Sequence, residues 1–412
     1  MRIIEKTQLA SIVSPQCNRN IPIHNWYTFK HGYSRDLAIN LINTFDLAEG
    51  AWVLDPFCGS GTTLLTCKEK GINSRGFDIL PFSVFLSNVK IGDYNNAELT
   101  KQLHMLADSL NNNRSSKNDS LPDIPLVNKA FQPDVKRELL LLKQKIECIH
   151  ESKIMAFFNL GFLSILESVS NTSKSGGFLR LVNRDVASDE VCTLFRNKVT
   201  SMINDTIESS KHSKSHEGVS SLAKIGDARR LPTDRKYDAV ITSPPYPNRH
   251  DYTRIYALEM IFDFVSSNDE LKKMRYETLR SHVEAKKKYE AIGYTKPTIL
   301  DSLITEVKRN GTNNPQIIDM LEGYFEDMYL CLSEINRCLK QQGKVALVVS
   351  NVRFAGVNIL VDEILAEIGS QVGLACKEIW AIRYRGNSSQ QMRDYQRKPS
   401  RESIIIWEKN GG

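Results

Sequence analysis

The chain alternates short apolar runs with longer amphipathic stretches, the pattern of strands and helices that follow one another. Apolar runs at 51–55, 237–241 and 343–349 predict buried strands. Residues 81–89 and 320–339 carry apolar side chains at helical spacing and predict helices. Strands and helices that take turns favour an α/β fold with a doubly wound, mostly parallel sheet.

Both ends of the chain depart from this alternation. Residues 1–24 show little pattern and predict irregular structure. The apolar stretches 379–383 and 403–407 predict two final strands, which we interpret as a hairpin. Two long blocks, 91–221 and 266–318, interrupt the alternation, and both predict largely helical insertions.

Composition sets only broad limits. The 412 residues are 41% apolar and 25% charged, as in ordinary globular proteins, and the net charge of +6 is compatible with nucleic acid. No apolar run approaches the roughly 20 residues that span a bilayer. We therefore expect a cytoplasmic protein without a membrane partner. The eight cysteines form no CxxC pair, and no Cys/His spacing indicates a metal site.

A glycine loop follows the strand at 51–55. Asp55 ends that strand, and Gly59-Ser60-Gly61 then opens a helix. Asp78 ends the next strand, and Asp227 ends a third. Doubly wound sheets bind ligands at the carboxyl ends of their strands, where a carboxylate can accept ribose hydroxyls. An acid at Asp55 suits a cationic ligand better than a pyrophosphate, so S-adenosylmethionine is the cofactor that fits.

Aromatic residues before the loop, Phe29 among them, are candidates for covering this cofactor, although core packing is an alternative. The cofactor-binding residues that we predict are Phe29, Asp55, Pro56, Phe57, Gly59, Gly61, Thr62, Asp78 and Asp227.

The strand at 237–241 ends in Ser243-Pro244-Pro245-Tyr246. Neither proline can donate to a sheet, so the backbone has to leave the sheet at this point. The Ser243 hydroxyl and the Pro244 carbonyl then become acceptors for an amine, and Tyr246 can stack on a base that has left the duplex. We predict Ser243, Pro244, Pro245 and Tyr246 as the catalytic residues, which we call the hook.

Polar residues after the hook and near the C-terminus are candidates for nucleic-acid contact. Arg249, His250, Tyr252 and Arg254 directly follow the hook, although a solvated helix start explains them too. Arg385 and Asn387 belong to a polar loop between the last two predicted strands, where polarity is also expected without function.

The two motifs together resemble the DNA amino-methyltransferases, and specifically their cytosine-N4 branch. Residues 55–63 resemble the cofactor motif of that family, and Thr242 to Tyr246 resemble its catalytic motif. Residues 29–41 are similar to its N-terminal cofactor segment. The resemblance implies a Rossmann-like sheet of seven strands with a reversed C-terminal hairpin, S-adenosylmethionine as cofactor and double-stranded DNA as substrate. Serine at position 243 favours cytosine N4, and adenine N6 is the alternative.

With this resemblance the chain divides into five parts. These are 1–90, the cofactor segment and first half of the methyltransferase domain; 91–221, a helical insertion and candidate for target recognition; 222–265, the catalytic half; 266–318, a charged insertion and candidate for DNA contact; and 319–412, the C-terminal part.

Other functions stay open at this point. RNA methylation is less favoured than DNA methylation because the sequence shows no dedicated RNA-binding module. A catalytically dead nucleic-acid-binding protein is less favoured because Asp55, Asp78, Ser243 and Tyr246 are intact. The resemblance also implies a restriction-modification or epigenetic role, with a cognate restriction endonuclease as a possible partner. We expect a monomer or a dimer and no metal.

Overall fold

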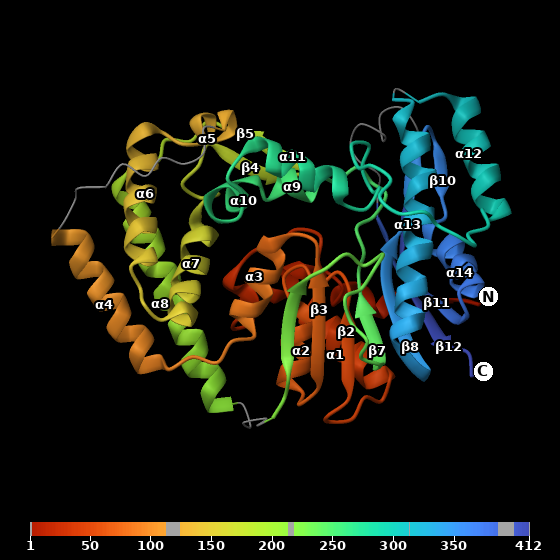
Figure 1. Ribbon diagram of the computed structural model, residues 1–412, viewed down its shortest axis with the longest axis horizontal. Coiled ribbons are helices and arrows are strands. Elements are labelled where there is room, and N and C mark those ends of the chain that lie inside the picture. Colours follow the sequence, from red (N-terminus) through yellow and green to blue (C-terminus); the bar gives the residue numbers. More distant parts are fainter. Residues whose placement is uncertain (1, 113–123, 213–217, 313, 386–398, 412) are drawn as a thin grey trace.

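The computed structural model describes residues 2–112, 124–212, 218–312, 314–385 and 399–411. Within these residues, eight strands form one sheet (Figure 1). Their order is β1-β11-β12-β8-β7-β2-β3-β6. The strands are β1 (Ile3–Glu5), β2 (Trp52–Asp55), β3 (Asn73–Asp78), β6 (Ser221–Ile225), β7 (Tyr237–Thr242), β8 (Leu339–Ser350), β11 (Leu374–Arg385) and β12 (Ser400–Lys409).

Neighbouring strands run parallel except at β12, which is antiparallel to both β8 and β11. The expected α/β fold, with a doubly wound sheet and a reversed C-terminal hairpin, is therefore confirmed. The sheet has one strand more than the seven expected, because Ile3–Glu5 adds parallel to β11. The prediction of irregular structure for 1–24 was wrong there, since three residues are too few to show a pattern and a distant strand decides their conformation.

The apolar runs exist because helices cover both faces of the sheet. Successive residues of a strand point to opposite faces. In β7, Ala239 and Ile241 pack with helix α1 (Arg35–Thr44) on one face. Val240, between them, packs with α13 (Gln316–Cys338) on the other.

The remaining elements complete these two layers and the insertions. The helices are α2 (Thr62–Glu69), α3 (Pro81–Lys90), α4 (Asn96–Asn112), α5 (Pro125–Ala130), α6 (Pro133–Glu147), α7 (Ser152–Ile165), α8 (Asp189–His212), α9 (Tyr252–Ile255), α10 (Ala257–Asp263), α11 (Asn268–Glu277), α12 (Thr298–Asn310) and α14 (Val361–Gln371). Two small hairpins are β4 (Thr172–Ser175) with β5 (Phe178–Leu181), and β9 (Val352–Phe354) with β10 (Val357–Ile359).

The insertion 91–221 is largely helical and stands to one side of the sheet (Figure 1). Its helices share a core with Trp26 and with α10, which follows the hook. The insertion also contains the β4–β5 hairpin, which the polar sequence around Ser173 did not predict.

The insertion 266–318 is helical only at its ends, in α11 and α12. Residues 278–297 between these helices are irregular, so the helical prediction was wrong for that stretch. Within the described residues, no helix has the length and apolar character needed to cross a membrane.

Gly61 at the start of α2 has a φ of +73°, and a Cβ there would lie 2.9 Å from Ser87 Oγ. Gly50 has a φ of +80° with nothing within 4 Å of its Cβ position, so it is a matched control. Gly50→Ala is expected to cost about 1 kcal/mol of unfolding free energy through backbone strain alone. Gly61→Ala is expected to cost about 1–3 kcal/mol more through overpacking. Urea unfolding of both variants measures this, and equal losses would show that the close contact is unimportant.

Candidate functional site

A cavity lies at the carboxyl ends of β2, β3, β6 and β7, where the sequence predicted a cofactor. We call it the cofactor cavity. Eight of the nine predicted cofactor residues line it, namely Phe29, Asp55, Pro56, Phe57, Gly59, Thr62, Asp78 and Asp227. The ninth, Gly61, is buried and packs against Ser87.

Asp55, at the end of β2, forms a hydrogen bond with the end of β7. Its Oδ1 accepts from Thr242 Oγ1 at 2.6 Å and from the Phe57 amide at 3.2 Å. The carboxylate is 2% exposed. Burial raises the pKa of Asp55 to about 6, and the hydrogen bonds from Thr242 and Phe57 limit the rise. None of the residues that the structure describes forms an ion pair with Asp55, and a buried carboxylate in this situation is suited to a positively charged ligand.

Asp78 at the end of β3 is bound to the glycine loop. Its Oδ2 accepts from the Gly59 amide at 3.0 Å, and its Oδ1 accepts from the Leu80 amide at 2.9 Å. Burial raises the pKa of Asp78 to about 6, against these two hydrogen bonds. Phe29 closes the other side of the loop, since a Cβ on Gly59 would lie 3.2 Å from its ring.

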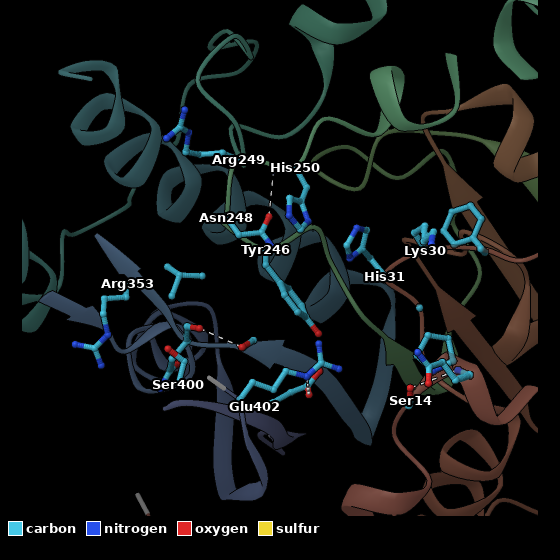
Figure 2. A pocket seen from close by; sticks show the side chains of 18 of the residues that line it. Ser14, Lys30, His31, Tyr246, Asn248, Arg249, His250, Arg353, Ser400 and Glu402 are labelled. Carbon is cyan, nitrogen blue, oxygen red and sulfur yellow. Dashed lines mark hydrogen bonds and ion pairs between the residues drawn. The ribbon is translucent and has the colours of Figure 1, made fainter. Parts of the chain in front are cut away.

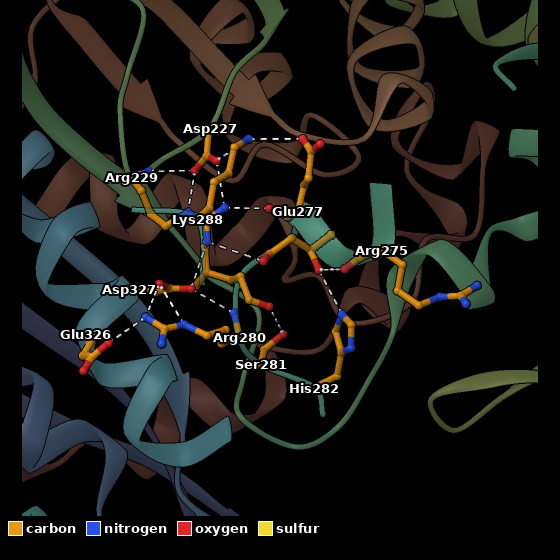
Figure 3. A network of polar contacts seen from close by, with 12 residues as sticks. Asp227, Arg229, Arg275, Glu277, Arg280, Ser281, His282, Lys288, Glu326 and Asp327 are labelled. Atoms are coloured by element: carbon orange, nitrogen blue, oxygen red, sulfur yellow. Dashed lines mark hydrogen bonds and ion pairs between the residues drawn. The ribbon is translucent and has the colours of Figure 1, made fainter. Parts of the chain in front are cut away.

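Asp227 differs from these two acids because it has cationic partners (Figure 3). Its carboxylate accepts from Arg229 Nε at 2.9 Å and from Arg229 Nη2 at 2.8 Å, and Lys288 lies 3.4 Å away. Burial alone would raise the pKa of Asp227, but Arg229 outweighs it and holds the pKa below its usual value. As an acceptor at a strand end, Asp227 is suited to the adenine amine of the predicted cofactor; this contact stays a prediction, with Arg229 as a competitor for the same oxygens.

Arg229 also connects the cofactor cavity with the insertion 266–318. It donates to Asp327 in α13 at 3.0 Å and to the Glu277 carbonyl at 2.6 Å. Arg280 donates to the same Asp327 at 2.7 Å. This network fixes residues 278–282, four of which line the cofactor cavity: Thr278, Leu279, Ser281 and His282. Part of the insertion expected to contact DNA is therefore a wall of the cofactor cavity.

The hook leaves the sheet after Thr242 and separates two cavities. Ser243 and Pro245 line the cofactor cavity, whereas Tyr246 lines a larger one. The Ser243 hydroxyl donates to the Val348 carbonyl at 3.0 Å, and its oxygen lies 3.3 Å from the Tyr246 hydroxyl. Because a hydroxyl has one proton, the bond to Val348 leaves the Ser243 oxygen as an acceptor.

The larger cavity has a volume of about 850 Å³, and we call it the cleft (Figure 2). Five cationic side chains and one carboxylate are among the described residues that line it. They are Arg19, Lys30, Arg249, Arg353 and Arg385, with Glu402 as the acid. The two cavities meet at Phe29, His31 and Gly32, which line both.

The structure divides the predicted DNA-contact residues between different places. Arg249, His250 and Arg385 line the cleft. Tyr252 lines the cofactor cavity instead, and Arg254 forms ion pairs with Asp251 and Glu284. Asn387 lies outside the described residues.

Three residues at the site were not singled out by the sequence. The Tyr33 hydroxyl contacts Thr63 and lies 3.4 Å from Asp55 Oδ2. The ring of His31 lies 4.3 Å from that of His250, and burial lowers the pKa of His31 to about 4. Glu402 is buried in β12. Tyr33 and His31 belong to the segment 29–41, so its similarity to a cofactor segment was a usable signal, whereas nothing in the sequence marked Glu402.

Comparison with known proteins agrees with this geometry. A DNA methylase family profile matches residues 19–87. The type II methyltransferase M.BsoBI of Geobacillus stearothermophilus is 33% identical, over 99% of this chain and 90% of its own. M.AvaI of Anabaena variabilis, also a type II methyltransferase, is 30% identical over 97% and 89%.

The chain belongs to the DNA amino-methyltransferase family. Among solved structures, the rRNA methyltransferase AviRa of Streptomyces viridochromogenes aligns over 98% of this chain and 94% of its own, with 10% identity and a TM-score of 0.33.

The methyl donor of this methyltransferase is S-adenosylmethionine. The cofactor cavity fits that molecule chemically. Asp55 is a buried carboxylate beside which a cationic ligand is favourable, and Asp78 is an acceptor at the strand end where a ribose is expected. The glycine at position 59 lets the backbone approach a ligand closely.

Cofactor affinity is expected to depend on pH through Asp55 and Asp78. Both carboxyl groups have a pKa of about 6, raised by burial, so they lose their protons as pH rises through 6. A cationic ligand binds the ionised form, so the Kd for S-adenosylmethionine should fall from pH 5 to pH 7, by up to about tenfold per unit for each proton released. Asp55→Asn should weaken binding at pH 7 and reduce this dependence.

Isothermal titration calorimetry at several pH values measures both effects. Glu408→Gln, an acid far from the cavity at the end of β12, is the control and should keep the wild-type profile. An affinity that is flat between pH 5 and pH 7 in the wild-type protein would contradict a role for these carboxylates.

Proposed function

We propose that this protein transfers a methyl group from S-adenosylmethionine to the N4 amine of a cytosine that has flipped out of duplex DNA. The observation that carries the proposal is the position of the hook. Ser243 and Pro245 line the cofactor cavity while Tyr246 lines the cleft. The hook therefore borders both cavities at the place where a methyl group would move from the cofactor to the base.

The residues of the hook suit an exocyclic amine. Such an amine is weakly nucleophilic because its lone pair is delocalised into the ring. Acceptors aimed at its N–H bonds favour the positive charge that develops as it attacks. The Ser243 oxygen is one such acceptor, because its own proton is donated to Val348. The Pro244 carbonyl is the second that we propose.

The cofactor supplies an electrophilic methyl group on a sulfonium. The new N–C bond forms as the S–C bond breaks, and the methylated amine then loses one proton to solvent. Tyr246 holds the ring of the base by stacking, which is worth roughly 1–3 kcal/mol per base. Holding the amine and the methyl carbon in line adds a proximity contribution.

The charge of the cleft supports DNA as the substrate. Five cations and one carboxylate face it among the described residues, and phosphate contacts supply most of the sequence-independent affinity for DNA. The named relatives are type II methyltransferases, so we also propose a modification role beside a cognate restriction endonuclease. Adenine N6 is the alternative target, and serine at position 243 favours cytosine.

The product decides between the two bases. Plasmid DNA incubated with the purified protein and isotopically labelled S-adenosylmethionine should contain N4-methylcytosine when its nucleosides are analysed by mass spectrometry. N6-methyladenine as the sole product would overturn the cytosine assignment, and no labelled nucleoside would overturn the activity.

Tyr246→Ala tests the stacking role. We expect turnover to fall about 10- to 100-fold, the equivalent of one lost stacking contact, with cofactor affinity unchanged because Tyr246 lies in the cleft. Tyr246→Phe is the matched control, since it keeps the ring, and it should retain most of the activity. Loss of cofactor binding in Tyr246→Ala would show that the hook is not a separate base site.

Arg249 tests the phosphate role of the cleft. It is exposed at the rim, so Arg249→Ala should weaken DNA binding and reduce the slope of log K against log salt by about 1. Lys101→Ala in α4, which removes an exposed charge outside the residues that line the cleft, is the control. Fluorescence anisotropy with a labelled duplex at several salt concentrations gives both slopes, and equal slopes would exclude a phosphate contact.

A further inference from the structure

A buried carboxyl group lies in the cleft next to Tyr246. Glu402 is 4% exposed, and its Oε2 accepts from Arg383 Nε and, at 3.2 Å, from Arg385 Nε. Figure 2 shows the Tyr246 ring extending toward Glu402. Burial raises the pKa of the Tyr246 hydroxyl, and the negative charge of Glu402 raises it further. Among the described residues, no other nearby charge affects the pKa of Tyr246 as much as that of Glu402.

The topology explains why this group meets the hook. Because β12 alone runs antiparallel to its neighbours, its first residues lie at the edge where the parallel strands end. Glu402 stands opposite Ser350 of β8 on one side and opposite Arg383 of β11 on the other. Ser350 is two residues beyond Val348, which holds the Ser243 hydroxyl.

Stability alone is a weak reason for this fold to keep the cluster. A buried ion pair is often no more stabilising than apolar residues of the same size. The ladder between β11 and β12 spans most of both strands, with register shifts at Cys376/Glu378 and Ala381/Arg383, and Ile404 and Ile405 give the hairpin an apolar core. Yet Glu402 and Arg385 both line the cleft, and the Arg385 side chain is 52% exposed. The position of the Glu402–Arg385 pair at the surface of the cleft therefore suggests that the pair contacts a ligand.

The edge of a flipped base offers a matching set of atoms. With the amine at Ser243 and the ring on Tyr246, the next atoms along the edge of cytosine are N3 and O2, which are both acceptors. Adenine presents N1, an acceptor, and then a C–H group. A guanidinium has five donors in a rigid fork and no acceptor, so it can satisfy both cytosine atoms but not the adenine edge.

We propose that Arg385, held in place by Glu402, forms the subsite that reads N3 and O2 of the flipped cytosine, and that Arg383 supports Glu402 from behind the lining of the cleft. The inference rests on the proposed cytosine-N4 activity. Glu402 and Arg383 are positioning residues, because they act through Arg385. A donor left facing the C–H of adenine has lost its partner, and this should disfavour adenine about 10- to 100-fold.

The test compares two duplexes that differ at one position. The target site is first located by mapping methylation on plasmid DNA, and a second duplex carries adenine in place of the target cytosine. Single-turnover methylation of both, followed by mass spectrometry of the nucleosides, gives the ratio of the cytosine rate to the adenine rate. Arg383→Gln, Arg385→Gln and Glu402→Gln are expected to lower this ratio about tenfold or more, with the Kd for S-adenosylmethionine unchanged.

Two further variants distinguish a loss of base discrimination from a general loss of DNA binding or folding. Arg249→Gln removes a cation from the rim of the cleft, so it should weaken DNA binding and leave the ratio at its wild-type value. Glu402→Asp keeps the carboxyl group and should restore part of the ratio that Glu402→Gln loses. Arg385 is half exposed, so its substitution tests the subsite even where Glu402→Gln impairs folding.

The outcomes distinguish the two proposals. If the wild-type protein forms only N6-methyladenine, the cytosine-N4 function itself is wrong. If it forms N4-methylcytosine and neither arginine variant changes the ratio, the subsite is wrong while the function stands.

Discussion

The two prolines that end β7 are the constraint on which the site depends. Pro244 and Pro245 cannot donate to a sheet, and β7 lies between β2 and β8, so the chain has to leave at the carboxyl edge. Hydrogen bonds donated to both neighbouring strands then fix the point where the chain leaves the sheet. Thr242 donates to Asp55 of β2, and Ser243 donates to the Val348 carbonyl of β8. The hook is rigid because two strands hold it, and this rigidity lets it separate two cavities.

The two cavities have opposite electrostatic character, which suits a reaction between a cation and a polyanion. The cofactor cavity has carboxyl groups at Asp55 and Asp78, which are ionised above about pH 6 although burial raises the pKa of both. The cleft has an excess of arginine and lysine. A cationic methyl donor and a DNA backbone are each favoured on their own side of the hook.

The insertions contribute to the site in ways that their composition did not suggest. Residues 278–282 belong to a charged stretch, yet Arg229 and Asp327 fix them as a wall of the cofactor cavity. The β4–β5 hairpin lies in a polar break of the other insertion. Its Gly177 carbonyl accepts from the Asp251 amide just after the hook, so this insertion reaches the rim of the cleft.

The sequence by itself determined the features that depend on neighbouring residues. Apolar runs identified β2, β7 and β8, because strands covered on both faces need continuous apolar sequence. The conformations of the glycine loop and of the two prolines could be predicted because the covalent structure of glycine and proline itself limits or widens the allowed backbone angles. The acids at strand ends were predictable as a group, because parallel strands end at one edge.

Only the tertiary structure decided the rest, because it depends on contacts between distant segments. Glu402 reaches the hook through the reversal of β12, and Asp227 is engaged by Arg229 within a network that extends to α13. Tyr252, predicted to contact DNA, lines the cofactor cavity. Ile3–Glu5, predicted to be irregular, forms a strand that pairs with β11. A residue's partners across the sheet have no signature in its local sequence, because register and strand direction are set by how the whole core packs.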